Sequence, residues 1–293
     1  MLRRLAMNTS CTGNACDAGC EPHAKAGLKS GRSPDNSGRP NPYMNVSAKP
    51  TKLRDIVLWR DMYRLEMGCQ IIHDSIHERP GWTDEYMLFA AGTAVGYGSV
   101  AVAGPWKGRP TAYEFYVVPH QRLHVFEFFQ ALLEVGGALD IEVQSNDTLA
   151  TTMLHAFAEQ ATSESILFHD KVCTSHRPTG ATFRAPAAKE ARDVPSDQLR
   201  WHGVVEVEGQ VAASGGILFH YNRPYGDIYM GVAEPFRRRG LGSFLVQELK
   251  RVCYEGGHVP AARCNPNNAA SRQTLQRAGF VPCGHILKGS VRR

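Results

Sequence analysis

Apolar residues recur at two spacings along most of the chain, and together these spacings predict an α/β fold. Alternating apolar and polar residues are typical of half-buried strands, and apolar residues three and four apart are typical of amphipathic helices. In the first part of the chain the pattern predicts helices over 53–67, 123–135 and 148–159 and strands over 86–91, 94–102, 111–118 and 139–143.

The same order of elements returns in the second part of the chain. The pattern there predicts helices over 240–254 and 269–278 and strands over 181–184, 202–208, 210–219, 227–232, 259–264 and 280–287. Gly279 follows the last of these helices, at a position where glycine often ends a helix. The repeated order predicts an internal duplication of about 120 residues per copy.

Composition divides the chain into three parts: a basic tail (1–52), a first domain (53–172) and a second domain (179–293). The tail is rich in Gly, Ser, Asn and Pro and has almost no large apolar residues, so we expect it to be disordered. It carries eight Lys or Arg and three Asp or Glu, which accounts for the whole net charge of +5. The folded part is neutral, so we expect no nucleic-acid partner.

Hydropathy and cysteine usage bear on the location of the protein. No apolar run approaches the ~18–20 residues that span a bilayer, and polar residues follow the first few positions where a signal peptide needs an apolar stretch. We therefore expect a cytoplasmic protein without a membrane partner, in which most of the eight cysteines are buried thiols. Histidine pairs at 73 and 77 and at 120 and 124 lack a third ligand, so we expect no metal.

The most informative stretch runs from Asp227 to Leu249. A predicted strand leads into a loop with three arginines and two glycines, and a long predicted helix follows. Gly240 and Gly242 carry no Cβ that would hinder a ligand from approaching the main chain. The N–H groups and dipole of the helix start favour an anion, so the stretch predicts a binding site for a diphosphate.

Two motifs in this region resemble those of the GNAT superfamily of N-acetyltransferases. Arg237-x-x-Gly240-x-Gly242 is similar to the family's diphosphate loop, and 265–280, with Asn268 and a closing Gly279-Phe280, is similar to its Asn-containing helix. The resemblance covers about 110 residues, a usual domain size. It implies an α/β fold of two tandem GNAT-like domains, each a mixed, mainly antiparallel sheet flanked by helices.

The resemblance also implies which residues bind the co-substrate acetyl-CoA. Main-chain N–H groups of the loop would hold the diphosphate, the strand that ends near Val232 would pair with the pantetheine arm, and Asn268 would bond that arm or cap its helix. The expected donor site consists of Met230, Val232, Arg237, Arg238, Arg239, Gly240, Leu241, Gly242, Ser243 and Asn268.

Acyl transfer to an amine also needs a base and a way for the thiolate to leave. Many GNAT members carry a tyrosine four residues before the Gly-Phe pair, and this chain has Leu275 there. We therefore expect Ser271, a water or a tyrosine from elsewhere in the chain to assist the thiolate, or the thiolate to leave unaided. Asp227 and Tyr229, on one face of a predicted strand, are the expected catalytic residues on the acceptor side; His220, Tyr221, Tyr225 and Glu206 remain alternative bases.

The first domain follows the same order of elements without the diphosphate loop. From His120 to Phe126 the sequence has no glycine, and bulky Leu123, Val125 and Phe126 take the place of the loop. We interpret this domain as a degenerate copy without a donor site. Because the second domain has little sequence between 184 and 201, we expect the first domain to help form the acceptor site.

These observations predict an acyltransferase that moves an acetyl group from acetyl-CoA to a primary amine by direct attack in a ternary complex. The expected acceptor is a small molecule, because two domains can enclose a cleft. A protein N-terminus or lysine is the first alternative acceptor, and a catalytically silent acyl-CoA-binding module is the alternative that the missing tyrosine favours. A homodimer is among the expected assemblies.

Overall fold

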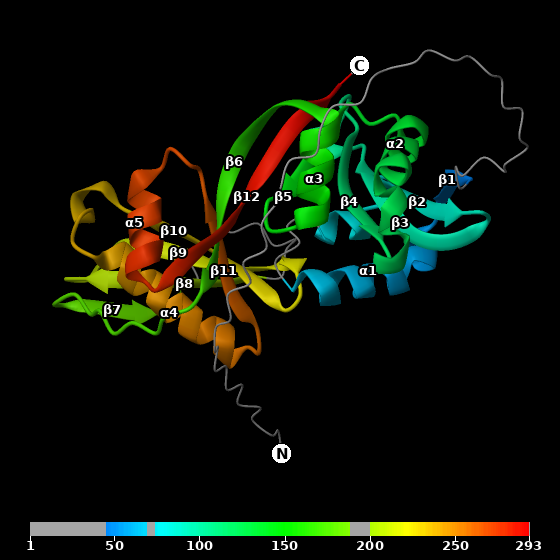
Figure 1. Ribbon diagram of the computed structural model, residues 1–293. Helices are drawn as coiled ribbons and strands as arrows, with labels where there is room; N and C mark the ends of the chain where they lie inside the picture. The colour runs from blue at the N-terminus through cyan, green and yellow to red at the C-terminus, as the bar shows by residue number, and fades with distance from the viewer. Residues whose placement is uncertain (1–44, 69–73, 188–199, 293) are drawn as a thin grey trace, which may run out of the picture. The chain divides into compact units, whose positions relative to one another are not determined.

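The described strands form one continuous mixed sheet on which the helices pack (Figure 1). The computed structural model describes residues 45–68, 74–187 and 200–292. Its 12 strands pair in the order β1-β2-β3-β4-β5-β12-β6-β11-β10-β9-β8-β7. They are β1 (Val46–Thr51), β2 (Thr83–Ala90), β3 (Thr93–Ala101), β4 (Thr111–Val117), β5 (Asp140–Gln144), β6 (Ala158–Asp170), β7 (Ala181–Arg184), β8 (Arg200–Val207), β9 (Gln210–Asn222), β10 (Tyr225–Val232), β11 (Val259–Cys264) and β12 (Phe280–Val291).

Five α-helices and four short 3₁₀ helices complete the described part of the chain. The α-helices are α1 (Leu53–Met67), α2 (Val125–Gly136), α3 (Thr148–Phe157), α4 (Leu241–Glu255) and α5 (Ala269–Arg277). The 3₁₀ helices are η1 (Asp74–Glu78), η2 (Gly104–Trp106), η3 (Pro119–His124) and η4 (Glu234–Phe236). Only β4–β5 and β10–β11 pair in parallel, so the sheet is mixed and mainly antiparallel, which confirms the predicted fold class.

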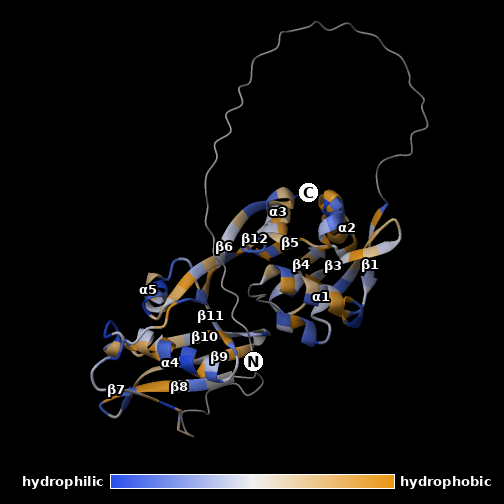
Figure 2. Cartoon of the chain, turned by 60° about the horizontal axis from the view of Figure 1, so that its bottom comes forward, coloured by the Kyte–Doolittle hydropathy of each residue, from blue (hydrophilic) through white to orange (hydrophobic). Residues whose placement is uncertain are grey.

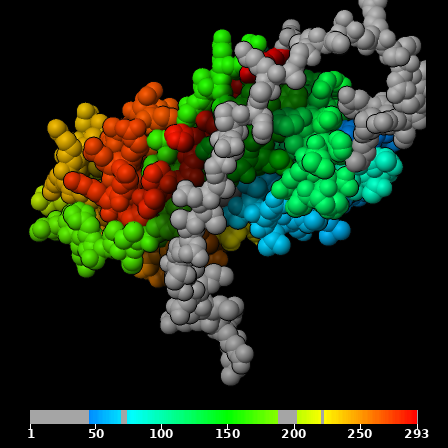
Figure 3. All heavy atoms as spheres, in the orientation of Figure 1, coloured from blue at the N-terminus to red at the C-terminus, as the bar shows by residue number. Residues whose placement is uncertain are grey.

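The two halves of the chain, β1 to β6 and β7 to β12, exchange their last strands. β6 pairs with β11 of the second half, from Ile166 opposite Cys264 to His169 opposite Ala261. β12 pairs with β5 of the first half, and β6 and β12 run antiparallel between these two partners. Figure 1 shows the red β12 between the green β5 and β6, and Figure 3 shows red atoms beside green ones. Each half therefore completes its sheet with a strand from the other.

Each half nevertheless has its own apolar core. In the first half α2 packs Phe128, Phe129 and Leu132 into a cluster with β2, β3 and β4. In the second half α4 packs Leu245 and Leu249 onto the sheet in a separate cluster. Both helices carry hydrophobic and hydrophilic residues (Figure 2), as expected for helices with one buried face. The burial of these faces holds the helices against the sheet.

The first half also buries a polar network between its sheet and α1. Arg60 of α1 reaches both carboxylate oxygens of Glu114 on β4, at 3.1 and 3.2 Å. His77 of η1 lies 2.7 Å from Glu85 of β2 and 3.2 Å from Glu114, and the hydroxyl of Tyr97 donates to Glu114. Because the buried charges are paired, this network ties α1 and η1 to the strands.

The network shifts the pKa values of its members in opposite directions. The neighbouring Arg60 and His77 hold the pKa of Glu114 well below its usual range, against the effect of burial. The two carboxylates raise the pKa of His77 to about 9, although burial alone would lower it. The network is thus a set of mutually neutralised charges at neutral pH.

Two strands were not predicted from the sequence. Residues 46–51, placed in the disordered tail, form β1 and pair with β2. Residues 158–170 form the long strand β6. The sequence pattern predicted a helix for 158 and 159 and no element for the rest of this segment. The rest of the tail, residues 1–44, lies outside the described residues. Within the described ranges no helix is both long and apolar enough to cross a membrane.

Candidate functional site

The predicted diphosphate loop lies between the end of β10 and the start of α4. η4 leads out of the strand, and Arg238 and Gly240 both adopt left-handed backbone conformations, with φ of 62° and 79°. Gly240 is the N-cap residue of α4. The first N–H groups of a helix have no hydrogen-bond partner within the helix. The N–H groups of Leu241, Gly242 and Ser243, which follow this turn, can therefore donate hydrogen bonds to an anion.

A pocket of ≈ 630 Å³ opens at this helix start, between β10 and α5. Every predicted donor-site residue except Arg239 lines it, and Ser271 lines it as well. The guanidinium of Arg239 instead lies 5.5 Å from the ring centre of Phe236. The structure thus brings together residues from three elements that are up to about forty positions apart in sequence.

Each of the two loop glycines is required by a different neighbour. A Cβ on Gly242 would lie 3.0 Å from Thr274 Cγ2 and 3.2 Å from Val232 Cγ2, so its absence lets α4 pack closely against α5 and β10. A Cβ on Gly240 would collide with the imidazole of His176. At both glycines the missing Cβ therefore makes room for another part of the protein: for α5 and β10 at Gly242, and for the imidazole of His176 at Gly240.

The strand next to the pocket offers main-chain groups on one edge. β10 and β11 pair in parallel from Tyr225 to Ile228. Beyond that point Met230 and Val232 pair within the described sheet only with β9. The splayed edge faces the pocket, so an extended ligand arm can add to β10 as a further strand. The carbonyl of Val232 accepts a bond from Arg237 Nε at 3.3 Å, which fixes the side chain of Arg237 across the loop.

The predicted residues of α5 have mainly local contacts. Asn268 caps the helix, because its Oδ1 accepts from the N–H of Ser271 at 3.0 Å. Capping was the alternative role for Asn268, and the structure shows it. Ser243 donates to the carbonyl of Thr274, which ties α4 to α5. Leu275 is 2 % exposed and belongs to the core, so the position that is tyrosine in many GNAT proteins points away from the pocket here.

Asp227 is buried on the sheet face opposite α4. The neighbouring Gly226 faces Cys253 of α4, and alternation along β10 turns Asp227 to the other face. Its Oδ2 lies 3.3 Å from Arg263 Nε, while its Oδ1 is buried without a hydrogen-bond partner among the described residues. Burial raises the pKa of Asp227 to about 6, against the opposing effect of Arg263. A buried carboxylate oxygen without a donor is a suitable acceptor for an ammonium group.

Tyr229 lies on the same face and is bonded to a residue that was not predicted. His202 Nδ1 is 3.1 Å from the Tyr229 hydroxyl. The two residues sit on β8 and β10 opposite Gly216 of the intervening β9, and this glycine leaves the space in which they meet. Only strand register brings His202 to the site, so a sequence pattern alone carried no signal for it.

The other alternative bases are less well placed. Glu206 is paired with Arg184 at 2.8 Å, and the Tyr225 hydroxyl donates to the carbonyl of Gly68 in the first half. The side chains of His220 and Tyr221 lie outside the described residues. In addition, η1 of the first half lies against β9. The first half thus contacts the sheet of the second half at β9, next to the strand that carries Asp227 and Tyr229. The two-part acceptor site stays a prediction.

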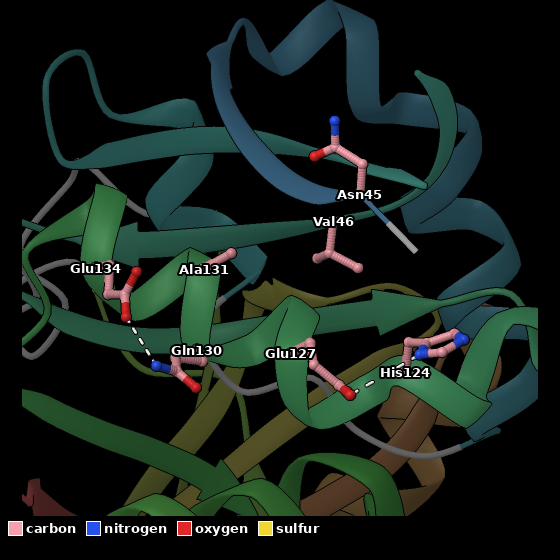
Figure 4. Close-up of a pocket in the computed structure, with 7 residues that line it drawn as sticks. All are labelled: Asn45, Val46, His124, Glu127, Gln130, Ala131 and Glu134. Atoms are coloured by element: carbon pink, nitrogen blue, oxygen red, sulfur yellow. Dashed lines mark hydrogen bonds and ion pairs between the residues drawn. The ribbon is translucent and has the colours of Figure 1, made fainter. Parts of the chain in front are cut away.

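The first half has a groove of a different kind. It measures ≈ 500 Å³ and lies between the start of β1 and α2, where His124, Glu127, Gln130 and Glu134 line it (Figure 4). Glu127 pairs with His124 at 3.8 Å, and Glu134 accepts from Gln130 at 2.8 Å. Two carboxylates and no glycine turn make this groove unsuited to a diphosphate.

Known proteins resemble this chain in the sequence of its second half and in its fold. Residues 169–280 match the acetyltransferase (GNAT) family, whereas no curated protein matches the chain in sequence. A GNAT-family acetyltransferase from Colwellia psychrerythraea is similar in structure, with a TM-score of 0.64 and 14 % identity over 84 % of this chain and 100 % of that one.

Two further solved structures are similar over about the same share of the chain. A tandem GNAT protein from the clavulanic acid biosynthesis pathway gives a TM-score of 0.57 at 12 % identity, over 85 % of this chain and 99 % of that one. A GCN5-related N-acetyltransferase from Sphaerobacter thermophilus gives 0.57 at 14 % identity, over 85 % and 96 %. The chain thus carries a GNAT acetyltransferase domain at residues 169–280 and has the fold of GNAT acetyltransferases, a tandem GNAT protein among them.

Proposed function

We propose that the protein is an N-acetyltransferase that transfers an acetyl group from acetyl-CoA to a primary amine of a small molecule. In this proposal residues 179–293 form the catalytic domain and residues 53–172 form a domain without a donor site. The observation that carries it is the pocket at the start of α4, where the glycine loop, the splayed edge of β10 and α5 meet.

Acetyl-CoA supplies the acetyl thioester, and the chain supplies the groups that hold it. The N–H groups at the start of α4, with Arg237 and Arg238 on the pocket wall, suit the diphosphate. The main chain of Met230 and Val232 suits the pantetheine arm. One N–H of this edge would polarise the thioester carbonyl, a form of oxyanion stabilisation.

Asp227 is the proposed base. The amine arrives as an ammonium ion, and the buried Oδ1 of Asp227 accepts one of its protons. The neutral nitrogen then attacks the thioester carbonyl, and the new N–C bond forms while the C–S bond breaks and its electron pair leaves on sulfur. The nitrogen releases its second proton to the thiolate or to water, which leaves a neutral amide. Tyr229, held by His202, lines the same face and would orient the acceptor. A base whose pKa lies near 6 is deprotonated at neutral pH.

The leaving thiolate can take a proton from a hydroxyl that lines the pocket, and Ser271 is the one that we propose. Ser271 lines the pocket at the start of α5. Leu275 is buried, and its side chain has no proton that it could donate. A thiol has a pKa of about 8.5, so a thiolate is a tolerable leaving group without a strong acid. Leu275 is also the observation that favours the second candidate function, an acyl-CoA-binding module that transfers nothing.

The proposal is tested by thiol release from acetyl-CoA with a panel of amines: polyamines, amino acids, aminoglycosides and peptides. Gly240→Trp serves as the control, because a side chain at Gly240 collides with His176 and obstructs the loop. Release above the control with one class of small amine supports the proposal. Release with peptides alone would favour a protein acetyltransferase, and binding of acetyl-CoA without any release would favour the binding module.

A further inference from the structure

The segment between β6 and β7, residues 171–180, is fastened at two points to the middle and second half of α4, which spans Leu241–Glu255. At the first, Lys250 of α4 donates to the carbonyl of Val172 at 2.8 Å. At the second, Gln247 of α4 accepts from the Thr174 hydroxyl and from the N–H of His176, both at 2.9 Å, and donates back to the carbonyl of His176 at 3.3 Å. We call residues 172–176 the strap. It is fixed in place by side chains of the helix that begins at the diphosphate loop.

The strap brings the imidazole of His176 to Gly240. The Nε2 atom would collide with the Cβ of any other residue at position 240, and it is the nearest neighbour of that Cβ position. Gly240 lines the pocket at the helix start, whereas His176 lies next to Gly240 and is not itself among the residues that line the pocket. The imidazole therefore stands beside the main chain of the loop, one residue away from the pocket lining, in the space that a side chain at position 240 would fill.

We propose that His176 is an additional ligand of the donor's diphosphate, contributed by the linker between the two halves. The inference rests on the proposed function, because it assumes that the pocket binds acetyl-CoA. An imidazole N–H is a donor that suits a phosphate oxygen, and it adds to the N–H groups and arginines already at the loop. Gln247 is then a positioning residue, since it holds the main chain of His176 without reaching the loop itself.

The proposal gives the linker a role beyond connecting the halves. The strap continues directly from β6, the strand that the first half contributes to the second half's sheet. A ligand that bonds His176 is held by α4 of the second half and by the segment that leaves the first half. Binding of the donor would then fasten the strap to the loop.

Calorimetry on the full chain tests this without an acceptor. We expect His176→Ala to weaken acetyl-CoA binding by about tenfold, the usual loss for one hydrogen bond to a charged group. His176→Gln keeps an N–H donor at a similar reach and is expected to recover most of the affinity. His155→Ala, an exposed histidine on α3, is the matched control and should bind as the wild type does.

A second ligand separates the diphosphate from the 3′-phosphate of the donor. With 3′-dephospho-CoA the loss in His176→Ala should persist if the contact is to the diphosphate, and it would vanish if the contact were to the 3′-phosphate. Unchanged or tighter binding of acetyl-CoA by His176→Ala would overturn the proposal. If the wild type itself bound no acetyl-CoA, the donor site would fail as a whole, an outcome distinct from the failure of His176 alone.

Discussion

At the scale of single residues, Asp227 combines a cost in stability with a chemical role. Its carboxylate is buried and, among the residues that the structure describes, has Arg263 beside it and one oxygen without a hydrogen-bond donor. A protein seldom keeps such a group for stability, because a polar isostere in the same place would be less costly to bury. A raised pKa in a polar recess is instead common among catalytic acids and bases.

We expect Asp227→Asn to lower kcat by about 10²- to 10⁴-fold, the usual contribution of a positioned base. In the wild type, kcat/KM should rise as the pH rises through about 6, because the unprotonated carboxylate is the active form. The variant should lose this limb of the pH profile. Glu206→Gln is the control on the same half, and it should keep the limb. Loss of the limb in Glu206→Gln instead would make Glu206 the base.

The same pKa predicts the direction of a stability change. In the folded protein the pKa of Asp227 is raised to about 6 from 3.8, so the folded state binds the proton more tightly than the unfolded chain. The contribution of Asp227 to the stability of the wild type therefore falls as the pH rises from about 4 to about 6. At pH 8 Asp227→Asn should be more stable than the wild type by about 1–3 kcal/mol, and near pH 4 the difference should shrink toward zero. Urea unfolding at both pH values measures it.

At the scale of elements, one buried lysine joins three of them. Lys250 of α4 is 4 % exposed; its ammonium lies 2.7 Å from Asp170 at the end of β6 and donates to the carbonyls of Val172 and Ala278. We expect Lys250→Met to destabilise the protein by about 3–5 kcal/mol, because it leaves the carboxylate of Asp170 buried without its cation.

The double variant Lys250→Met with Asp170→Asn distinguishes charge pairing from packing. It should recover part of the loss, since no buried charge is then left unpaired. Thermal or urea unfolding of both single variants and the double variant completes the cycle. If the double variant lost as much stability as the two single variants together, the ammonium of Lys250 would stabilise the protein mainly through its hydrogen bonds to the carbonyls of Val172 and Ala278.

Elements with a clear period could be predicted from sequence, and elements held by distant partners could not. The apolar spacing of α2 and α4 follows from the face that each helix buries. The first half of β6 has no such pattern, because residues 159–164 are exposed and are held by main-chain pairing with β12. β1 is short and contains Pro50. It forms a strand because its main chain pairs with β2 at the edge of the sheet.

The donor site was more accessible to prediction than the acceptor side for the same reason. The loop and the helix start are contiguous in sequence, so their motif can be recognised directly. The contact of His202 with Tyr229 depends on the register of three strands, and that of His176 with Gly240 depends on how the strap crosses α4. Residues brought together by such long-range pairing leave no local pattern.

At the scale of the whole molecule, the strand exchange makes the two halves dependent on each other. A second half without β6 would leave β11 and the first part of β12 as facing strands without the partner between them. A first half without β12 would leave β5 paired only with β4, over two residues. Unpaired edges of this kind are costly and prone to association. Neither half should therefore fold cooperatively by itself.

Expression of residues 1–179 and 180–293, separately and together, tests this dependence. The cut falls between Thr179 and Gly180, which are exposed and lie beyond the strap. We expect each fragment alone to lack a cooperative unfolding transition, and the co-expressed pair to elute as one complex that binds acetyl-CoA. The intact chain, cleaved by a protease at a site inserted at the same position, is the control for the cut itself and should stay associated until urea is added. If fragment 180–293 alone unfolded cooperatively and bound acetyl-CoA, then β12 would have closed the sheet without β6. The exchange would in that case link the halves without being needed by the catalytic one.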